Sequence, residues 1–417
     1  MKSFARKHLS LSLLACLLSA GACVLAETPR ANADTKKAKV EKGEQTQVAS
    51  KQTQSSSSFA LKFFTETAKN PKENVLVSPY SAYAALSMTL NGAAGKTLEQ
   101  MAKTLGVGSG GVDALNARNK SVMASLNAND KVKLEIANAI FSEKALPFKQ
   151  SFIDACKQYY NAEARSMKFG DPATLNEINS WCNTKTHGKI AKILDNLSEQ
   201  EKMVLLNAIY FKGAWLDKFD PASTLDDKFT DVSGKQVPVR MMHKNNKYYY
   251  LKGENFESLI MPYAGSKQSM YIFLPDKNVG LNAFQAKLTD SNWKKWMDAY
   301  ERRDVNLELP KFKLETSSNL RDVLSKMGMT DAFSDKANFT KMIEQSGNLS
   351  RVLQKTYMEV SEEGTEAAAV TAVTFAPRTA MRNPQPPVNF RVDRPFVLAL
   401  MDNSNDEILF LGSVVKP

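Results

Sequence analysis

The segment from residue 362 to residue 373 constrains the fold of this chain more than any other part. It reads Glu-Glu-Gly-Thr-Glu-Ala-Ala-Ala-Val-Thr-Ala-Val, a charged start followed by small or β-branched side chains. Alanine favours helices whereas valine and threonine favour strands, so the run has no firm preference of its own. In an extended chain every second residue shares a face that could slot into a sheet without a bulky clash: Thr365, Ala367, Ala369, Thr371, Val373 and Phe375. The segment therefore indicates a loop that is able to become a strand.

Residues 1–22 have the pattern of an export signal. Lys2, Arg6 and Lys7 form a positive start, and residues 9–26 are apolar with small residues towards the end. A transmembrane anchor is the alternative interpretation. Serines interrupt the apolar stretch, however, and it is short for a bilayer crossing.

Three cleavage positions fit this signal. Residues 19–23 read Ser-Ala-Gly-Ala-Cys and resemble a bacterial lipoprotein box, in which Cys23 would be lipidated and become the new N-terminus. Cuts after Ala26 or Ala33 satisfy the small-residue rule of ordinary signal peptidase. We favour the lipoprotein because residues 23–58 form a tether, expected to be disordered, that is almost without apolar side chains after residue 33. About 25 residues of this kind reach roughly 25–30 Å, enough to hold a domain away from a membrane.

The location expected from these features is outside the cytoplasm. With a lipid on Cys23 it is a bacterial outer-membrane surface or the periplasm, and without the lipid the protein is secreted. The lipid would be the sole contact with a membrane. Metabolic labelling with palmitate tests this expectation, since an unlabelled wild-type protein would remove it.

Charge and cysteine content exclude several kinds of partner. The formal net charge is +11, but the basic residues are spread out without a dense stripe or interleaved aromatics, so nucleic-acid binding is not expected. Two of the four cysteines lie in the signal region, and we expect the other two, Cys156 and Cys182, to be buried free thiols and not a disulfide. No cysteine and histidine spacing indicates a metal, and no cofactor is expected.

Residues 59–417 are predicted to form one α+β domain. Helices and strands are mixed without a regular alternation or an internal repeat, which favours large mixed sheets over a doubly wound one. Ser58 is expected to cap the first helix, and Ser78 followed by Pro79 to open the second. Further helices are expected over 97–105, 111–127, 173–186 and 281–302, and strands over 203–211, 270–274, 305–314 and 408–414.

Five segments, in this order and spacing, resemble the serpin family over essentially all of residues 59–417. They are Asn-Val-Leu-Val-Ser-Pro-Tyr-Ser at 74–81, Asn-Ala-Ile-Tyr-Phe-Lys-Gly-Ala-Trp at 207–215, Leu-Pro-Lys-Phe at 309–312, the start of the loop segment at 362–369, and Asp-Arg-Pro-Phe at 393–396. The resemblance implies three β-sheets surrounded by eight or nine helices. It also implies an exposed reactive loop over about 362–387.

The function implied by the resemblance is suicide inhibition of a protease by a monomer. The protease attacks the loop as a substrate and forms an acyl-enzyme. The cut loop then inserts as a central strand of the main sheet and carries the protease with it. About 15 inserted residues would span roughly 50 Å. Their backbone hydrogen bonds would stabilise the inserted state by an amount on the order of 10 kcal/mol, so the native state would be metastable.

The resemblance places the attacked bond between Arg378 and Thr379, fourteen residues after Gly364. Arginine before the cut suits a trypsin-like serine protease, whose specificity pocket carries a carboxylate. Pro377 fixes an extended backbone before it, and the preceding subsites are Phe375 and Ala376. Phe375, for a chymotrypsin-like protease, and Arg382 remain alternative sites of attack. Cysteine proteases specific for arginine would accept the same bond, so the class of the target stays open.

The resemblance also places a hinge at the start of the loop. Insertion must be faster than deacylation, so bulky, charged or proline residues at inserting positions would abolish trapping. The hinge residues are mostly small or β-branched, and the charged Glu366 points outward at a period of two. This composition indicates an inhibitor: Glu362, Gly364, Thr365, Glu366, Ala367, Ala368, Ala369 and Val370.

Five residues match those with which the family controls opening of the main sheet, and we call them the sheet-opening residues. They are Ser78, Ser81, Asn207, Gln354 and Trp215. Gln354 replaces the histidine usual in the family. An amide keeps a donor and an acceptor but does not titrate, so hydrogen bonding is expected to survive and pH sensitivity to be lost. Ordinary core packing is the alternative role for all five.

An enzyme is not expected from this sequence. Outside the signal region the histidines are His187 and His243, and neither lies in a motif with a nucleophile or a metal site. The main alternative to an inhibitor is a non-inhibitory serpin that acts as substrate, carrier or chaperone. Cleavage of the loop without a trapped complex would identify it. A surface binding protein that depends on its tether is a third possibility, which deletion of residues 34–58 would test.

Overall fold

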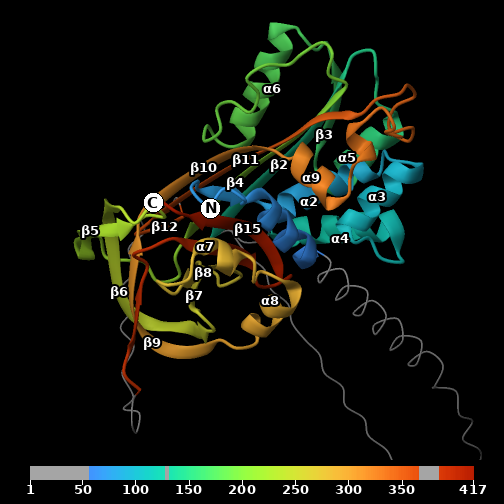
Figure 1. The fold of residues 1–417 in the computed structure, drawn as a ribbon. Helices are drawn as coiled ribbons and strands as arrows, with labels where there is room; N and C mark the ends of the chain where they lie inside the picture. The colour runs from blue at the N-terminus through green and yellow to red at the C-terminus, as the bar shows by residue number, and fades with distance from the viewer. Residues whose placement is uncertain (1–55, 127–130, 366–384) are drawn as a thin grey trace, which may run out of the picture. The chain divides into compact units, whose positions relative to one another are not determined.

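The computed structural model describes residues 56–126, 131–365 and 385–417, all of which belong to one structural unit. The predictions for the export signal, for Cys23 and for most of the tether lie outside the described residues. In the part that is described, no helix is long and apolar enough to cross a bilayer. The described chain folds as two β-sheets with helices packed on them (Figure 1).

The six-stranded sheet has the order β10-β11-β12-β4-β2-β3. Its strands are β10 (Phe312–Asn319), β11 (Leu349–Ser361), β12 (Gly364–Thr365), β4 (Met203–Ala214), β2 (Val132–Glu143) and β3 (Glu163–Met167). The first ten residues of β4 include nine fully buried ones, as expected for a strand covered on both faces. The predicted strand over 203–211 is confirmed.

The pairing of β11 changes along its length, and this change positions the candidate site. From Leu349 to Tyr357 the strand pairs in parallel with β4, from Met203 to Tyr210. Beyond that point the short strand β12 lies between the two and pairs antiparallel with both. The two central strands are thus in direct contact along most of the sheet and are separated at one end.

The larger sheet has nine strands in the order β1-β15-β14-β8-β7-β6-β9-β13, with β5 beside β6. Three sheets were expected from the resemblance. Strand β6 is 18 residues long and pairs with β5, β9 and β7 in turn, so two of the expected sheets are continuous through β6 and form one nine-stranded sheet. Its strands are β1 (Val75–Val77), β5 (Thr224–Thr230), β6 (Gln236–Gly253), β7 (Phe256–Pro262), β8 (Gln268–Pro275), β9 (Glu301–Pro310), β13 (Val388–Arg391), β14 (Phe396–Asp402) and β15 (Glu407–Val414).

Helices cover both faces of the six-stranded sheet (Figure 1). Alternate residues of β4, Val204, Leu206 and Ala208, pack in one core with Ile178 and other side chains of α6. After a first helix over 56–67, the helices are α2 (Pro79–Leu90), α3 (Gly95–Leu105), α4 (Gly111–Leu126), α5 (Gln150–Tyr160), α6 (Pro172–Lys185), α7 (Leu281–Gln285), α8 (Asp290–Met297) and α9 (Arg321–Met327), with 3₁₀ turns at Pro221–Ser223 and Asp331–Phe333.

Helix α2 is buried on all sides beneath the six-stranded sheet. As predicted, Ser78 caps it: the Ser78 hydroxyl accepts a hydrogen bond from the Ser81 amide at 3.3 Å, and Pro79 occupies the first turn. The cap fixes the start of the helix at the sheet, which places both serines against β4 and β11.

Two predictions about helices were wrong. Ser58 does not cap the first helix, because residues 56–58 are already helical; the predicted tether therefore runs into this helix. The helix expected over 281–302 is broken into α7 and α8, and its last two residues belong to β9. Thr289 caps α8 by accepting from the Asn292 amide, and pairing with β6 draws residues from Glu301 onward into the sheet. Local propensity yields to these long-range contacts.

Both remaining cysteines are buried free thiols, as predicted. Cys156 lies in α5 and Cys182 in α6. Burial raises the pKa of each thiol to about 12, so both stay protonated and unreactive at neutral pH.

Candidate functional site

The candidate site is the turn that joins β11 to β12, residues 361–365, which we call the hinge turn. It lies where the two central strands of the six-stranded sheet separate. Gly364 pairs with Ala214, and Thr365 pairs with Gly213. Thr365 is fully buried, and its hydroxyl lies 2.6 Å from the hydroxyl of Tyr263. The first residue of the run noted in the sequence therefore already occupies a strand position.

Only glycine fits at position 364. Its φ is +143°, in the range that side chains rarely adopt. A Cβ at this position would overlap the carbonyl oxygen of Gly213 and lie 2.7 Å from the Cα of Ala214. Both obstacles are backbone atoms of β4 and cannot rotate away. The conformation of Gly364 thus directs the chain into the space between the two strands.

Trp215 and Tyr263 form the wall behind the hinge turn. The Trp215 amide donates to the carbonyl of Glu363 at 3.0 Å, and its indole nitrogen donates to the carbonyl of Ser361 at 3.0 Å. The two aromatic rings stack with centroids 4.5 Å apart. Burial raises the pKa of Tyr263, so its hydroxyl remains protonated. Trp215 thus holds the backbone of the turn at Ser361 and Glu363, and Tyr263 holds the side chain of Thr365.

Two ion pairs hold the acidic residues of the hinge turn. Glu362 pairs with Lys311 at 2.7 Å and accepts a hydrogen bond from the Thr224 hydroxyl at 2.9 Å. Glu363 pairs with Lys218 at 2.6 Å. Partial burial alone would raise the pKa of Glu362, but the hydrogen bonds from Lys311, its own backbone and Thr224 together lower it below the ordinary value.

We expect the contribution of Glu362 to stability to disappear in acid. A carboxyl whose pKa is lowered by folding stabilises the native state above its unfolded pKa, and this stabilisation is lost as the pH falls through the lowered folded pKa. The difference in urea midpoint between the wild type and Glu362→Gln should therefore be largest at neutral pH and vanish in strong acid. Glu315→Gln, an exposed position on β10, is the control. A difference that grows on acidification would contradict the assignment.

Four of the sheet-opening residues meet in one polar cluster beneath the sheet. The Gln354 side chain accepts from the Ser78 amide and donates to the Ser78 carbonyl, each at 2.9 Å, and also donates to Asn207 Oδ1 at 2.6 Å. The Asn207 amide in turn donates to the Ser81 hydroxyl, and to Asn138 Oδ1 at 2.5 Å. The Gln354–Asn207 bond joins β11 to β4 directly. The cluster therefore links β11 and β4 to each other and to the start of α2.

The fifth sheet-opening residue, Trp215, lies apart from this cluster. It follows β4 eight residues after Asn207, about 26 Å along an extended chain. The predicted group of five thus divides into a polar cluster beneath the sheet and an aromatic wall at the hinge turn. The expectation that Gln354 keeps its hydrogen bonds is met, since each of its polar atoms has a buried partner.

Replacing Gln354 by alanine should destabilise the protein by about 3 kcal/mol. The change leaves the amide and carbonyl of Ser78 and Oδ1 of Asn207 buried without this partner, and each unsatisfied group costs about 1–3 kcal/mol. Urea unfolding measures the effect, with Ser317→Ala at an exposed position of β10 as the control. Equal midpoints for the two variants would show that the cluster does not hold the sheet closed.

Most of the predicted loop lies outside the described residues. These positions are Glu366, Ala367, Ala368, Ala369 and Val370 of the hinge, the subsites Phe375, Ala376 and Pro377, and the bond between Arg378 and Thr379. The chain is described again from Gln385 and enters β13, which pairs with β9. The two ends of the loop therefore join different sheets.

Sequence reasoning missed several contacts of the site. Tyr263, Thr224, Lys218 and Asn138 lie in segments that carried no signal, because their roles depend on pairing between distant strands. Lys311 stood in the quoted segment 309–312, but nothing local indicated that it would pair with Glu362. The sequence contains many lysines, and none of them is marked locally as the partner of Glu362 or Glu363.

The fold and the site together define a class of protein: an α+β chain in which the short strand β12 lies between the two central strands of the six-stranded sheet at one end. The profile of the family described as Serpin (serine protease inhibitor) matches residues 54–417. This chain therefore belongs to the serpin family.

Individual relatives agree with this assignment. Serpin B6 of Macaca fascicularis is 36% identical over 371 residues, covering 86% of this chain and 97% of the relative. Leukocyte elastase inhibitor of Sus scrofa is 35% identical over 374 residues, covering 86% of this chain and 97% of the relative. Among solved structures, the thermophilic serpin tengpin in its native state is 35% identical with a TM-score of 0.80, covering 88% of this chain and 94% of tengpin. Human thyroxine-binding globulin, solved with thyroxine, is 30% identical with a TM-score of 0.81, covering 89% of this chain and 99% of the globulin.

Proposed function

We propose that this serpin inhibits a trypsin-like serine protease by suicide trapping. The protease would acylate at the bond between Arg378 and Thr379, and the cleaved loop would insert between β11 and β4. The observation that carries the proposal is Thr365, which is buried between these two strands while the rest of their length is paired directly. This is the arrangement from which insertion can propagate.

The register of β12 predicts the path of insertion. Extending its antiparallel pairing from Thr365 places Thr371 opposite Asn207 on β4 and opposite Gln354 on β11. These two residues are bonded to each other before insertion. Insertion must break that bond, and the hydroxyl of Thr371 offers both a donor and an acceptor to replace it. Small residues on both sides of Thr371 fit between the strands.

The energetics favour insertion after cleavage. Separating β11 from β4 breaks one parallel ladder, and a new strand forms two antiparallel ladders. About a dozen backbone hydrogen bonds are gained in the balance, each worth about 0.5–1.5 kcal/mol net. The gain is on the order of 10 kcal/mol. The polar cluster and the hinge turn supply the barrier that keeps the uncleaved protein in its native state.

The comparisons support inhibition in general. Two relatives carry the names leukocyte elastase inhibitor and plasminogen activator inhibitor 2. The trypsin-like target rests on Arg378 alone, because a buried carboxylate in the specificity pocket pairs with arginine. Cysteine proteases specific for arginine are the second class of target that this residue suits.

A non-inhibitory carrier is the competing function. It is favoured by the structural match to thyroxine-binding globulin, which was solved with a bound hormone. The composition of the hinge argues against the carrier function, because a carrier has no need for a run of small residues that fits between two strands.

Inhibition kinetics test the proposal. The full chain is incubated with trypsin, chymotrypsin or an arginine-specific cysteine protease, and the residual activity is followed with time. We expect irreversible loss of trypsin activity at a ratio of inhibitor to protease near one. Preferential loss of chymotrypsin activity would move the attacked bond to Phe375. Rapid cleavage without loss of any activity would favour the carrier.

A further inference from the structure

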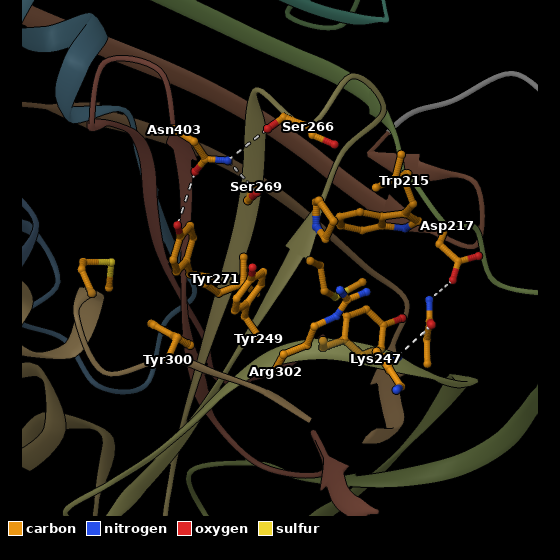
Figure 2. A pocket seen from close by; sticks show the side chains of 17 residues that line it. Trp215, Asp217, Lys247, Tyr249, Ser266, Ser269, Tyr271, Tyr300, Arg302 and Asn403 are labelled. Atoms are coloured by element: carbon orange, nitrogen blue, oxygen red, sulfur yellow. Dashed lines mark hydrogen bonds between the residues drawn. The ribbon is translucent and has the colours of Figure 1, made fainter. Parts of the chain in front are cut away.

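A cavity of about 590 Å³ lies beside the hinge turn and is not used by the proposed mechanism. It is bounded by the segment after β4, by strands of the nine-stranded sheet and by the chain that follows α8 (Figure 2). Sites for small ligands have volumes of about 300–1,000 Å³. The cavity is therefore large enough for a ring system with a polar substituent.

One face of the nine-stranded sheet forms the floor of this cavity. Arg302 on β9 pairs with Tyr249 on β6, Tyr249 pairs with Ile260 on β7, and Ile260 pairs with Tyr271 on β8. Directly paired residues share a face, so these four side chains form a row across the sheet. Lys247 lies two residues before Tyr249 and joins the same face.

The cavity exposes apolar surface to water. Tyr249 is 54% exposed and Leu216 is 55% exposed, and both line the cavity. They are two of the four exposed large apolar side chains in the described part of the chain. Apolar surface left open in a concave site marks a place where a ligand gains free energy by displacing water.

Hydrogen bonds fix the polar side chains along the rim. Asn403 donates to the Ser269 hydroxyl at 2.9 Å and accepts from the Tyr271 hydroxyl at 3.3 Å (Figure 2). The carboxylate of Asp217 is occupied by Lys244 and Asn246. Asp217 is the one acidic side chain among the described residues that line the cavity, and Lys244 neutralises its charge. The rim is therefore held in place before any ligand arrives.

Two basic side chains that line the cavity, Lys247 and Arg302, have no ion-pair partner among the described residues. Among the described residues, the side chains of Lys247 and Arg302 make no ion pair and no hydrogen bond, although Asp304 stands opposite Lys247 in the strand register. Figure 2 shows the Arg302 side chain reaching towards Trp215 across the floor. A guanidinium without an ion-pair partner, next to Tyr249 in the strand register, suits an anion attached to an apolar group.

We propose that this cavity binds a small amphiphilic carboxylate. Its apolar or aromatic part would lie on Tyr249, Leu216 and Ile260, and its carboxylate would pair with Arg302, with Lys247 adding a second positive charge. Binding would be independent of cleavage of the loop.

The test uses the full chain and two matched probes. Isothermal titration calorimetry compares 2-naphthylacetate with its neutral analogue 2-naphthylacetamide. We expect saturable binding of the carboxylate at one site and binding of the amide that is about tenfold weaker or more, since a hydrogen bond to a charged group is lost. The same loss should appear when Arg302→Gln binds the carboxylate, and Arg302→Lys should restore part of the affinity.

Variants locate the site. Tyr249→Ala should weaken both probes, because it removes the apolar floor and not the charge. Lys228→Gln, an exposed lysine on β5 outside the cavity, should bind like the wild type. The proposal would be overturned by absence of saturable carboxylate binding, by equal affinity for the two probes, or by an equal effect of Lys228→Gln and Arg302→Gln. Because no protease is present, failure of inhibition would leave these outcomes unchanged.

Discussion

Replacing Arg378 by alanine should reduce the rate at which trypsin is inhibited by about a hundredfold or more. In the encounter with a trypsin-like protease, the guanidinium would be desolvated in the specificity pocket and paired with its carboxylate. Truncating one partner of such a pair costs about 2–5 kcal/mol, and each 1.4 kcal/mol is a factor of ten. The measurement is the second-order rate constant from progress curves with a chromogenic substrate.

The matched control for this variant is Arg382→Ala, four residues further along the same loop. It removes the same side chain and should leave the rate nearly unchanged. The urea midpoints of both variants should equal that of the wild type. If Arg382→Ala slows inhibition and Arg378→Ala does not, the attacked bond follows Arg382 and the assignment of Arg378 is wrong.

Replacing Thr365 by arginine should convert the inhibitor into a substrate. Thr365 is fully buried between β11 and β4, and its hydroxyl bonds to Tyr263. The nearby carboxylates of Glu362 and Glu363 are already paired with Lys311 and Lys218, so a guanidinium at this position would be buried without a partner of its own, which costs several kcal/mol. Insertion would slow by about a hundredfold or more, so deacylation would release active protease. The stoichiometry of inhibition should rise steeply while the rate of loop cleavage stays high.

Thr365→Ser provides the control because it keeps the hydroxyl and the small volume. It should trap protease with a stoichiometry close to that of the wild type. The contradictory result would be efficient trapping by Thr365→Arg, which would show that insertion does not pass through the position of β12. Insertion between β11 and β4 would then have to be abandoned.

The features that the sequence predicts well depend on neighbouring residues. The cap at Ser78 with Pro79 after it, and the apolar run that becomes β4, carry their signals within a few residues. The class of fold followed from five ordered segments. The lack of a firm helix or strand preference in the loop segment was also visible locally, because alanines are mixed with β-branched side chains in it.

The features that the sequence did not predict depend on contacts between residues that are far apart in the chain. Residues 301–302 have no local reason to leave a helix, but their pairing with β6 places them in a strand. Asn138 joins the polar cluster solely because β2 pairs with β4 in the register that sets it opposite Asn207. The ion pair between Glu362 and Lys311 likewise joins residues that are far apart in the chain.

Mixing the full chain with excess trypsin tests the central claim most directly, with a denaturing gel and mass spectrometry of the released peptide. Trapping by loop insertion predicts a covalent band near the summed mass of the two proteins and a C-terminal peptide that begins at Thr379. Complete cleavage after Arg378 without the covalent band would contradict it, since the loop would then be a substrate that is cut faster than it inserts.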